Sequence, residues 1–356
     1  MIASTATAVP EHVITRDDVK LYFDRVFPID EYRVRAMMSV VDNSRIDRRY
    51  GVFPLEYLVA PRPLTVTTLE YQDHAIRLGQ QAAEAALANA GIGPRDVDLL
   101  ITTSCTGFMI PSLDAHLIHR MGFRSNVRRL PITELGCAAG AASLARAAEL
   151  LGALPEGNVL LISVELPSLT FQRADQSQAN LISAILFGDG AAGVVVTGRD
   201  VPGPRILSSE GYVFPDSLGA MGFDLKDSGF HIVLSADVPD MIRQRIRGIV
   251  DGFLESHQLS RDRIASFILH PGGQKLLSYV EEELGLVPPD DGTGVFRRPK
   301  SKPSWDVLAN FGNLSSASVL FVLDQWIRCS RPAPGAYGLL AAFGPGFSAE
   351  MSLLEW

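Results

Sequence analysis

Cysteine is scarce in this sequence, which has only three among 356 residues: Cys105, Cys137 and Cys329. An odd number of widely spaced cysteines gives no disulfide framework and no C-x-x-C motif, which suits a reducing compartment. His116 and His119 are spaced for a metal pair, but no further cluster of ligands accompanies them. We therefore expect neither disulfides nor a metal site.

Long apolar runs and a net positive charge are also lacking. No stretch of about eighteen uninterrupted apolar residues occurs, which argues against a membrane span. The opening segment, MIASTATAVPEHVITRDD, does not have the charged and then apolar plan of a signal peptide. The net charge is −8, so no broad basic surface is offered to nucleic acid. We expect a cytoplasmic protein with no nucleic-acid partner.

Hydrophobic residues, by contrast, make up 47% of the sequence and charged residues 20%, which suffices for a sizeable core. Helical and strand-like patterns alternate, which indicates an α/β class. Apolar residues at helical spacing predict helices over 70–90 and 242–257. Buried strands are expected over 96–104, 158–165, 191–198, 265–270 and 336–344.

Local patterns of the sequence occur twice, in the same order. PRDVDLLI (94–101) is echoed by SRDRIASFIL (260–269), and LGCAAGAAS (135–143) by FGNLSSASV (311–319). GNVLLISVE likewise parallels AYGLLAAFG. Any one echo could arise by chance, but three in order indicate a duplication.

The echoes predict two similar α/β units that face each other across a pseudo-twofold axis. The stretch GRDVPGPRI, with its glycines and prolines, is the expected boundary and gives halves of residues 1–203 and 204–356. The second echo aligns Cys137 with Asn313. Because equivalent helix starts meet near such an axis, we expect these two residues to converge on one site.

Cys137 stands at the start of a run of small residues, where a helix is expected to begin. Two readings are open at this point. A free cysteine is among the most buried residue types and packs well in a helix of small residues. Alternatively, the unpaired N–H groups and dipole of a helix N-terminus favour an anion and lower the thiol's pKa from about 8.5 toward neutrality.

His270 and Asn313 are the other chemical candidates. His270 ends a predicted buried strand and precedes Pro-Gly-Gly, where α/β sheets place functional groups, although a hydrogen-bonded core histidine fits equally well. Asn313 opens the second small-residue helix. Its side chain is a candidate N-cap of that helix, and its amide is alternatively a candidate hydrogen-bond donor to a developing oxyanion. GDGAAG (188–193) matches a dinucleotide-binding pattern, but it runs into a strand and lacks the required helix.

Together, GCAAG, LFGDGAA, HPGG, GNLSSAS and the terminal AFGPG resemble the type III polyketide synthases, the chalcone synthase-like branch of the thiolase superfamily. The resemblance covers nearly the whole chain, is weakest at 1–60 and 199–235, and is closest to bacterial members. It implies a thiolase-like αβαβα layered fold and a homodimer. It also implies an acyltransferase that condenses malonyl-CoA onto an acyl-CoA starter, with coenzyme A thioesters as substrates and no other cofactor.

By motif position, the resemblance implies that Cys137 carries the growing acyl chain and that His270 holds it as a thiolate. His270 and Asn313 are implied to bind the malonyl thioester carbonyl, and Phe187 to be the gatekeeper between the coenzyme tunnel and the cavity. The implied cavity-lining residues are Cys105, Thr106, Pro167, Thr170, Met221, Phe230 and Ser315. The loop at Ile110-Pro111 is implied to enter the partner subunit's cavity.

The family's basic coenzyme-binding residues fall on a segment that has alanine, serine and asparagine here. Arg33, Arg35, Arg45, Arg48 and Arg49 are candidates to replace them as phosphate contacts, and a reading as solvated surface charge is equally good.

Several functions stay open. Within the class, we favour a long-chain acyl starter that gives an alkylpyrone or alkylresorcinol, and a naphthol-type synthase that uses malonyl-CoA alone is the alternative. A ketoacyl-carrier-protein synthase III would share the Cys-His-Asn chemistry but perform a single condensation. A catalytically inactive, thiolase-shaped binding partner is disfavoured, because Cys137, His270, Asn313 and Phe187 are all present.

Overall fold

Two larger β-sheets frame the protein in the computed structural model, which describes residues 1–27, 29–287, 299–330 and 332–356. The first sheet contains, in spatial order, β1 (Ile2–Ala8), β7 (Gly190–Thr197), β6 (Asn158–Glu165), β4 (Leu99–Ser104) and β5 (Arg128–Thr133). The second contains β11 (Ile264–Leu269), β12 (Tyr337–Gly344), β13 (Ser348–Glu355) and β8 (Arg205–Val213).

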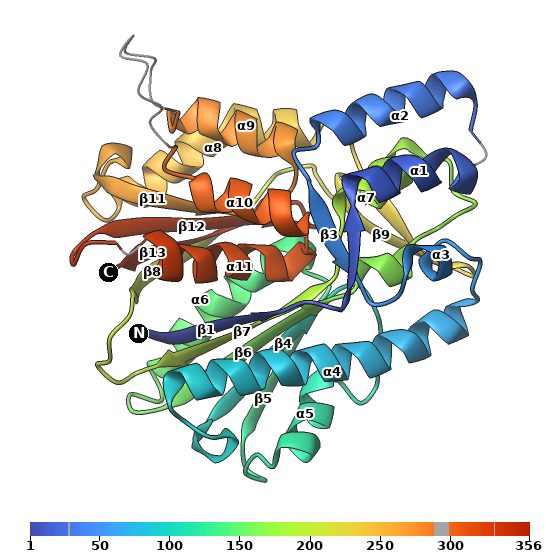
Figure 1. The fold of residues 1–356 in the computed structure, drawn as a ribbon. Coiled ribbons are helices and arrows are strands. Elements are labelled where there is room, and N and C mark those ends of the chain that lie inside the picture. Colours follow the sequence, from blue (N-terminus) through green and yellow to red (C-terminus); the bar gives the residue numbers. More distant parts are fainter. Residues whose placement is uncertain (28, 288–298, 331) are drawn as a thin grey trace.

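Helices lie outside and between these sheets (Figure 1). The outer face of the first sheet is covered by α4 (Leu64–Ala90) and α5 (Leu113–Met121), and that of the second by α8 (Val238–Glu255) and α9 (Gln274–Leu284). Between the sheets lie α6 (Ala139–Leu151) and α11 (Ser318–Gln325), with α10 (Lys302–Phe311) beside α11. The predicted αβαβα layering is confirmed.

The second sheet repeats the first, as the echoes predicted. β8, β13, β12 and β11 correspond to β1, β7, β6 and β4, with two antiparallel pairings followed by a parallel one in each sheet. A 3₁₀ turn precedes each central helix, Gly136–Ala138 before α6 and Ser315–Ala317 before α11. The duplication therefore extends to the helix starts.

The predicted register between these helix starts is wrong, however. Gly136 and Ser315 begin the two turns with φ angles of 50° and 49°. Cys137 therefore corresponds to Ser316 and not to Asn313. The sequence echo aligns Gly136 with Gly312. In the structure, the residue that corresponds to Gly136 is Ser315, which adopts the left-handed conformation that glycine has in the first turn.

Small residues let the two central helices meet at close range. A Cβ on Gly140 would lie 2.2 Å from the backbone oxygen of Ser316 and 3.0 Å from Val319 Cγ1. The Ser316 hydroxyl lies 2.8 Å from that of Ser163 on β6. The alanines and glycines that follow Cys137 thus serve the contact between the two halves.

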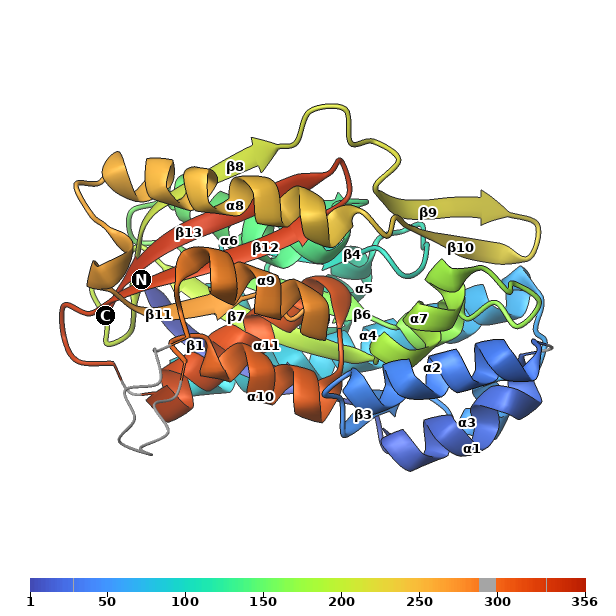
Figure 2. The same cartoon turned by 90° about the horizontal axis from the view of Figure 1, so that it is seen from above.

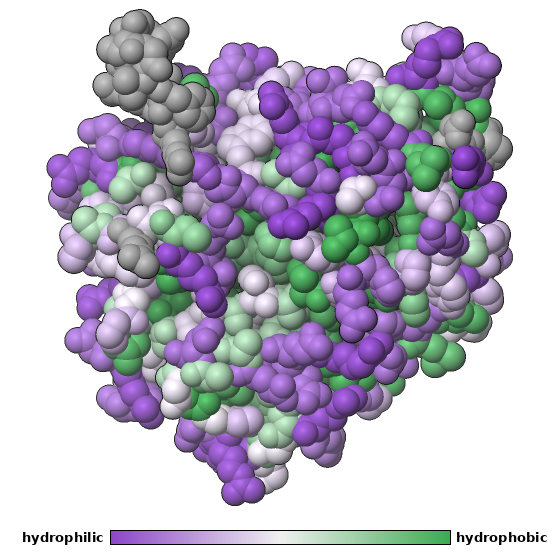
Figure 3. All heavy atoms as spheres, viewed as in Figure 1, coloured by the Kyte–Doolittle hydropathy of each residue, from purple (hydrophilic) through white to green (hydrophobic). Residues whose placement is uncertain are grey.

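A lobe of shorter elements covers one end of the sheets (Figure 2). Apolar side chains gather in the recessed middle of the face in Figure 3, amid a mostly hydrophilic surface. Among the described helices, none is long and apolar enough to cross a membrane. The lobe contains β2 (His12–Thr15), α1 (Arg16–Val26), α2 (Glu31–Asn43), β3 (Arg48–Gly51), α3 (Leu55–Leu58), α7 (Gln178–Leu186), β9 (Met221–Lys226) and β10 (Gly229–Leu234).

Replacing Gly140 by alanine tests the contact between the central helices. The added Cβ meets a backbone oxygen that cannot rotate away, so the free energy of unfolding in urea should fall by about 1–3 kcal/mol. Gly248→Ala is the control, because Gly248 is exposed on α8 with nothing within 4 Å of a Cβ there. That variant should gain about 0.4–1 kcal/mol. Wild-type stability of Gly140→Ala would contradict the close approach.

Candidate active site

Cys137 lies in the turn that opens α6 and is 7% exposed. A Cβ on the preceding Gly136 would lie 2.5 Å from Pro345 Cδ, in the loop after β12. Glycine meets both this close approach and the positive φ of the turn. Because β12 belongs to the second sheet, the thiol stands where the two halves join.

Ser315 links Cys137 to a second thiol. Its hydroxyl oxygen lies 3.6 Å from Cys137 Sγ and 3.3 Å from Cys105 Sγ. The positive φ of Ser315 is a conformation that destabilises a non-glycine residue by about 1–2 kcal/mol. Its N–H donates to Asn313 Oδ1 at 2.8 Å, and this bond holds the strained backbone in place.

The backbone of Asn313 is tied to the segment that carries Phe187. Asn313 N–H donates to the Leu186 carbonyl at 2.8 Å, and Gly188 N–H donates to the Asn313 carbonyl at 3.0 Å. Phe187, which follows the last residue of α7, faces the cavity described below. A shift of Asn313 would therefore move the proposed gatekeeper as well.

The side chain of Asn313 has two sets of contacts. Its Oδ1 caps the following turn by accepting from the Ser315 N–H and, at 3.3 Å, from the Ser318 hydroxyl. Its Nδ2 donates to the Gly272 carbonyl at 3.3 Å, which is a long bond. The cap therefore leaves the amide N–H groups directed at Gly272.

His270 follows β11 and is 2% exposed. A Cβ on Gly272 would lie 3.3 Å from the ring Cδ2 and 3.4 Å from Nε2, so the imidazole packs on the glycine whose carbonyl Asn313 contacts. Within the described part of the chain, the buried Nδ1 has no hydrogen-bond partner. A core histidine with satisfied nitrogens is therefore not what is seen. Contacts through Gly272, Asn313 and Ser315 connect His270 to Cys137.

Burial determines the charge state of these groups. It raises the pKa of Cys137 to about 12, against the opposing hydrogen bonds of Ser315 and Asn313. It also lowers the pKa of His270 to about 3. This direction is opposite to the lowered thiol pKa that one reading of the helix N-terminus expects, because desolvation disfavours the charged form of the thiol. A thiolate at this position requires an opposite charge beside it.

Glu165, which the sequence analysis missed, lies directly behind the thiols. It ends β6, is fully buried, and accepts hydrogen bonds from Thr106 Oγ1 at 2.7 Å, the Cys105 N–H at 3.1 Å and the Ser316 hydroxyl. Burial raises its pKa. The available signal was a single acidic residue at the end of the otherwise apolar strand NVLLISVE.

A cavity of about 440 Å³ opens in front of Cys137 and Ser315. Apolar side chains from α1 and α3 line part of it, including Val19, Phe23 and Leu58. Every predicted lining residue is found there, namely Cys105, Thr106, Pro167, Thr170, Met221, Phe230 and Ser315. In the portion of the chain that the structure describes, no group of three His, Cys, Asp or Glu side chains is placed to hold a metal.

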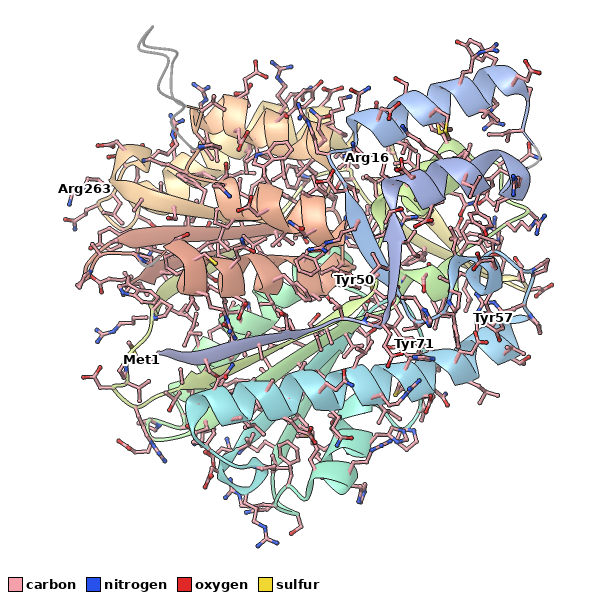
Figure 4. The ribbon with its side chains drawn as sticks, viewed as in Figure 1. Met1, Arg16, Tyr50, Tyr57, Tyr71 and Arg263 are labelled. Carbon is pink, nitrogen blue, oxygen red and sulfur yellow. The ribbon has the colours of Figure 1, made fainter. Side chains whose placement is uncertain are left out.

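Tyr71, labelled in Figure 4, connects this region to α4. Its hydroxyl donates to Ser104 Oγ at 2.7 Å. A Cβ on Gly107 would lie 2.2 Å from the Tyr71 ring, so the loop after β4 can adopt its course only with glycine at that position. The same loop carries Phe108 and Ile110, which are 59% and 81% exposed. Its entry into a partner subunit stays a prediction.

The predicted coenzyme contacts divide into two groups. Arg33, Arg35, Arg45 and Arg48 are exposed or half-buried at the surface and are not among the cavity-lining residues. Arg33 donates to the Gln176 carbonyl at 2.5 Å, Arg35 pairs with Glu31 at 3.5 Å, and Arg48 donates to Asn310 Oδ1 at 3.1 Å.

Arg49, in contrast, is buried, so its reading as surface charge is wrong. Its guanidinium donates to the carbonyls of Ala184 and Ile185, in the last turn of α7 just before Phe187. Asp189, fully buried, is an opposite charge that favours the charged form of Arg49 and raises its pKa against the effect of burial. Arg49 therefore fixes the end of the helix that positions Phe187.

Comparison with known proteins supports the family resemblance over nearly the whole chain. The family model described as "Chalcone and stilbene synthases, N-terminal domain" matches residues 1–200, and the corresponding C-terminal domain matches 205–355. A 1,3,6,8-tetrahydroxynaphthalene synthase of Streptomyces peucetius subsp. caesius is 39% identical over 100% of this chain and 93% of its own length. A phloroglucinol synthase of Pseudomonas fluorescens is 34% identical over 98% and 96%.

The fold matches solved structures equally well. The crystal structure of 1,3,6,8-tetrahydroxynaphthalene synthase from Streptomyces coelicolor A3(2) has a TM-score of 0.93 and 33% identity, and covers 100% of this chain and 99% of that one.

Two adjacent arginines provide a matched test of the site's framework. Arg49→Met removes a buried cation from the end of α7 and leaves buried Asp189 without the positive charge of Arg49, so the free energy of unfolding should fall by about 2–4 kcal/mol. Arg48→Met removes an exposed side chain and should change stability by at most about 0.5 kcal/mol. Urea denaturation measures both. The assignment fails if the two variants lose equal stability.

Proposed function

The chain belongs to the chalcone and stilbene synthase family of type III polyketide synthases, and we propose that it loads an acyl-CoA starter onto Cys137, extends it with malonyl-CoA and cyclises the product. The observation that supports this most is the position of Cys137 on a largely apolar cavity, against Ser315, whose N–H is held by Asn313. His270 packs on Gly272, the residue whose carbonyl Asn313 contacts. It works as a homodimer in the cytoplasm in this proposal.

The loading step needs a nucleophile. Cys137 passes its proton to His270, and the sulfur attacks the starter thioester while the CoA thiol leaves with a proton. Burial opposes each charge separately, but a thiolate and an imidazolium attract each other strongly in a dry site. Protonated His270 supplies the positive charge that stabilises the thiolate, because the helix N-terminus alone does not overcome the effect of burial.

The extension step needs hydrogen-bond donors for an enolate oxygen. Decarboxylation of malonyl-CoA releases CO₂ and leaves an enolate, whose oxygen accepts hydrogen bonds from the His270 imidazole N–H and the Asn313 amide. The long bond from Asn313 to Gly272 is weak enough to be exchanged for the stronger one to an enolate. Loss of one such donor typically costs about 3 kcal/mol of transition-state stabilisation. The enolate carbon then attacks the acyl-Cys137 thioester and frees the sulfur.

The cavity favours a long acyl starter. Beyond the thiol, its walls are apolar side chains of α1 and α3, among them Val19, Phe23, Leu55 and Leu58. An apolar chain gains up to about 0.8 kcal/mol for each methylene buried there. A polar malonyl group gains nothing from such walls. We therefore propose a long-chain acyl-CoA as starter and a pyrone- or resorcinol-type product.

A malonyl-only reaction is the second candidate. Its support is the 39% identity to a 1,3,6,8-tetrahydroxynaphthalene synthase over the full chain. Arg33, Arg35, Arg45 and Arg48 are proposed as phosphate contacts in either case, since all lie on or near α2 and β3 at the surface of the lobe.

Product analysis on a panel of starters separates these candidates. Malonyl-CoA would be supplied alone or with acetyl-, hexanoyl-, lauroyl- or palmitoyl-CoA, without carrier protein. We expect kcat/KM to rise by at least about tenfold from hexanoyl- to lauroyl-CoA, because added methylenes are buried. Cys137→Ser is the control and should show no acyl adduct by intact mass spectrometry.

Other outcomes of the panel count against the proposal. A hydroxylated naphthalene from malonyl-CoA alone, with no gain from acyl starters, would favour the second candidate. A single-extension product that requires carrier protein would contradict both.

A further inference from the structure

The β9–β10 hairpin is a separate two-stranded sheet that forms one wall of the cavity. Its lining residues are Met221, Gly222, Phe223, Leu225, Phe230 and Ile232. It extends from the C-terminal half over α7, which belongs to the N-terminal half (Figure 2). Among the described strands, neither β9 nor β10 pairs with a third, so side-chain contacts must hold the hairpin in position.

His231 provides the main polar link. Side chains alternate along a strand, so His231 points away from the cavity while its neighbours Phe230 and Ile232 point into it. Its Nδ1 lies 3.3 Å from Asp175 Oδ2, and its Nε2 lies 2.7 Å from Ser228 Oγ. The His231 and Asp175 side chains are only 16% and 18% exposed, so water screens the pair weakly.

The segment that carries Asp175 is itself rigidly held. Asp175 Oδ1 accepts from the Ser177 N–H at 2.8 Å, and the Asp175 carbonyl accepts from Asn180 Nδ2 at 2.7 Å. Gln172 Nε2 adds a second link, donating to the Ser228 carbonyl at 3.3 Å. Asp175 is thus an anchor fixed to the start of α7, and the hairpin is the element it restrains.

We infer that Asp175 and His231 are positioning residues that clasp the hairpin onto α7 and thereby set the length of acyl chain that the cavity accepts. The inference rests on the proposed function, because it concerns the starter of that condensation. Without the clasp, the hairpin wall can move outward and lengthen the cavity. In the described contacts the hairpin makes no hydrogen bond to Cys137, His270 or Asn313, so the chemistry itself is spared.

A hydrolytic role for the same three residues is less consistent with the geometry. The order Ser228, His231, Asp175 matches that of a Ser-His-Asp triad. However, Ser228 is exposed at the hairpin turn and is not among the residues that line the cavity. A positioning role uses every contact observed and needs no further group.

Asp175→Asn and His231→Phe test the clasp, because they remove the charge or both ring nitrogens at similar volume. The preference for palmitoyl- over hexanoyl-CoA, as a ratio of kcat/KM, should rise by about tenfold, the factor that corresponds to loss of one charged hydrogen bond. Turnover of hexanoyl-CoA should stay near wild type. Ser228→Ala, which keeps the bond to Asp175, should shift the ratio less.

Asp224→Asn is the matched control, since Asp224 is the cross-strand partner of His231 on the same hairpin and is exposed. It should leave the ratio unchanged. Hydrogen exchange of residues 221–234 provides a readout that needs no turnover, and it should quicken in the two clasp variants but not in Asp224→Asn.

An unchanged starter ratio in both clasp variants overturns the inference, whether or not exchange quickens. If the wild-type protein extends no acyl-CoA at all, the proposed function fails instead. In that case hydrogen exchange alone tests the clasp. Exchange of residues 221–234 in the two clasp variants at the wild-type rate would refute it.

Discussion

The contact between the turn Gly136–Ala138 and the turn Ser315–Ala317 determines where the functional side chains lie. Gly140 admits the Ser316 backbone oxygen at a distance that no Cβ would tolerate. This approach puts the Ser315 hydroxyl against Cys137 Sγ and the Ser316 hydroxyl against Glu165. The run of small residues around the thiol is therefore required by packing, and the site is a consequence of that packing.

The same packing removes water, and this gives the site its chemical character. Cys137, His270, Glu165 and Asn313 are all buried, and burial shifts each titratable group among them toward its neutral form. A neutral, dry site strengthens any hydrogen bond to a charge that appears during reaction. In the proposed mechanism, the only charges formed are those that the reaction itself creates, and each has a partner within the site.

Much of the fold follows from the sequence, and the exceptions have physical reasons. The strands over 158–165 and 191–198 and the helix over 70–90 carry strong local patterns and are found with small shifts. The strand expected from 96 begins at Leu99, because Pro94–Asp96 forms a 3₁₀ turn. The motifs singled out Cys137, His270 and Asn313, whose catalytic roles stay predictions. The echo misaligned the halves because Ser315 adopts a glycine-like conformation.

Residues whose roles depend on distant partners could not be predicted. Arg49 has the same local context as Arg48, and only the position of α7 makes one buried and the other exposed. Glu165 and the β9–β10 hairpin likewise acquire their environment from segments far away in sequence. Local patterns describe elements, whereas burial of a charge is decided by the packing of elements against one another.

In the proposed mechanism, His270, and not the helix N-terminus, makes Cys137 reactive by taking its proton when the sulfur attacks. The pH dependence of Cys137 alkylation by iodoacetamide tests it in the wild type and in His270→Gln. Without the histidine, burial holds the thiol pKa near 12. The variant's rate should then rise by about tenfold per pH unit from about pH 6 to about pH 9, while the wild-type rate stays nearly level. Identical profiles for the two proteins would contradict this role of His270.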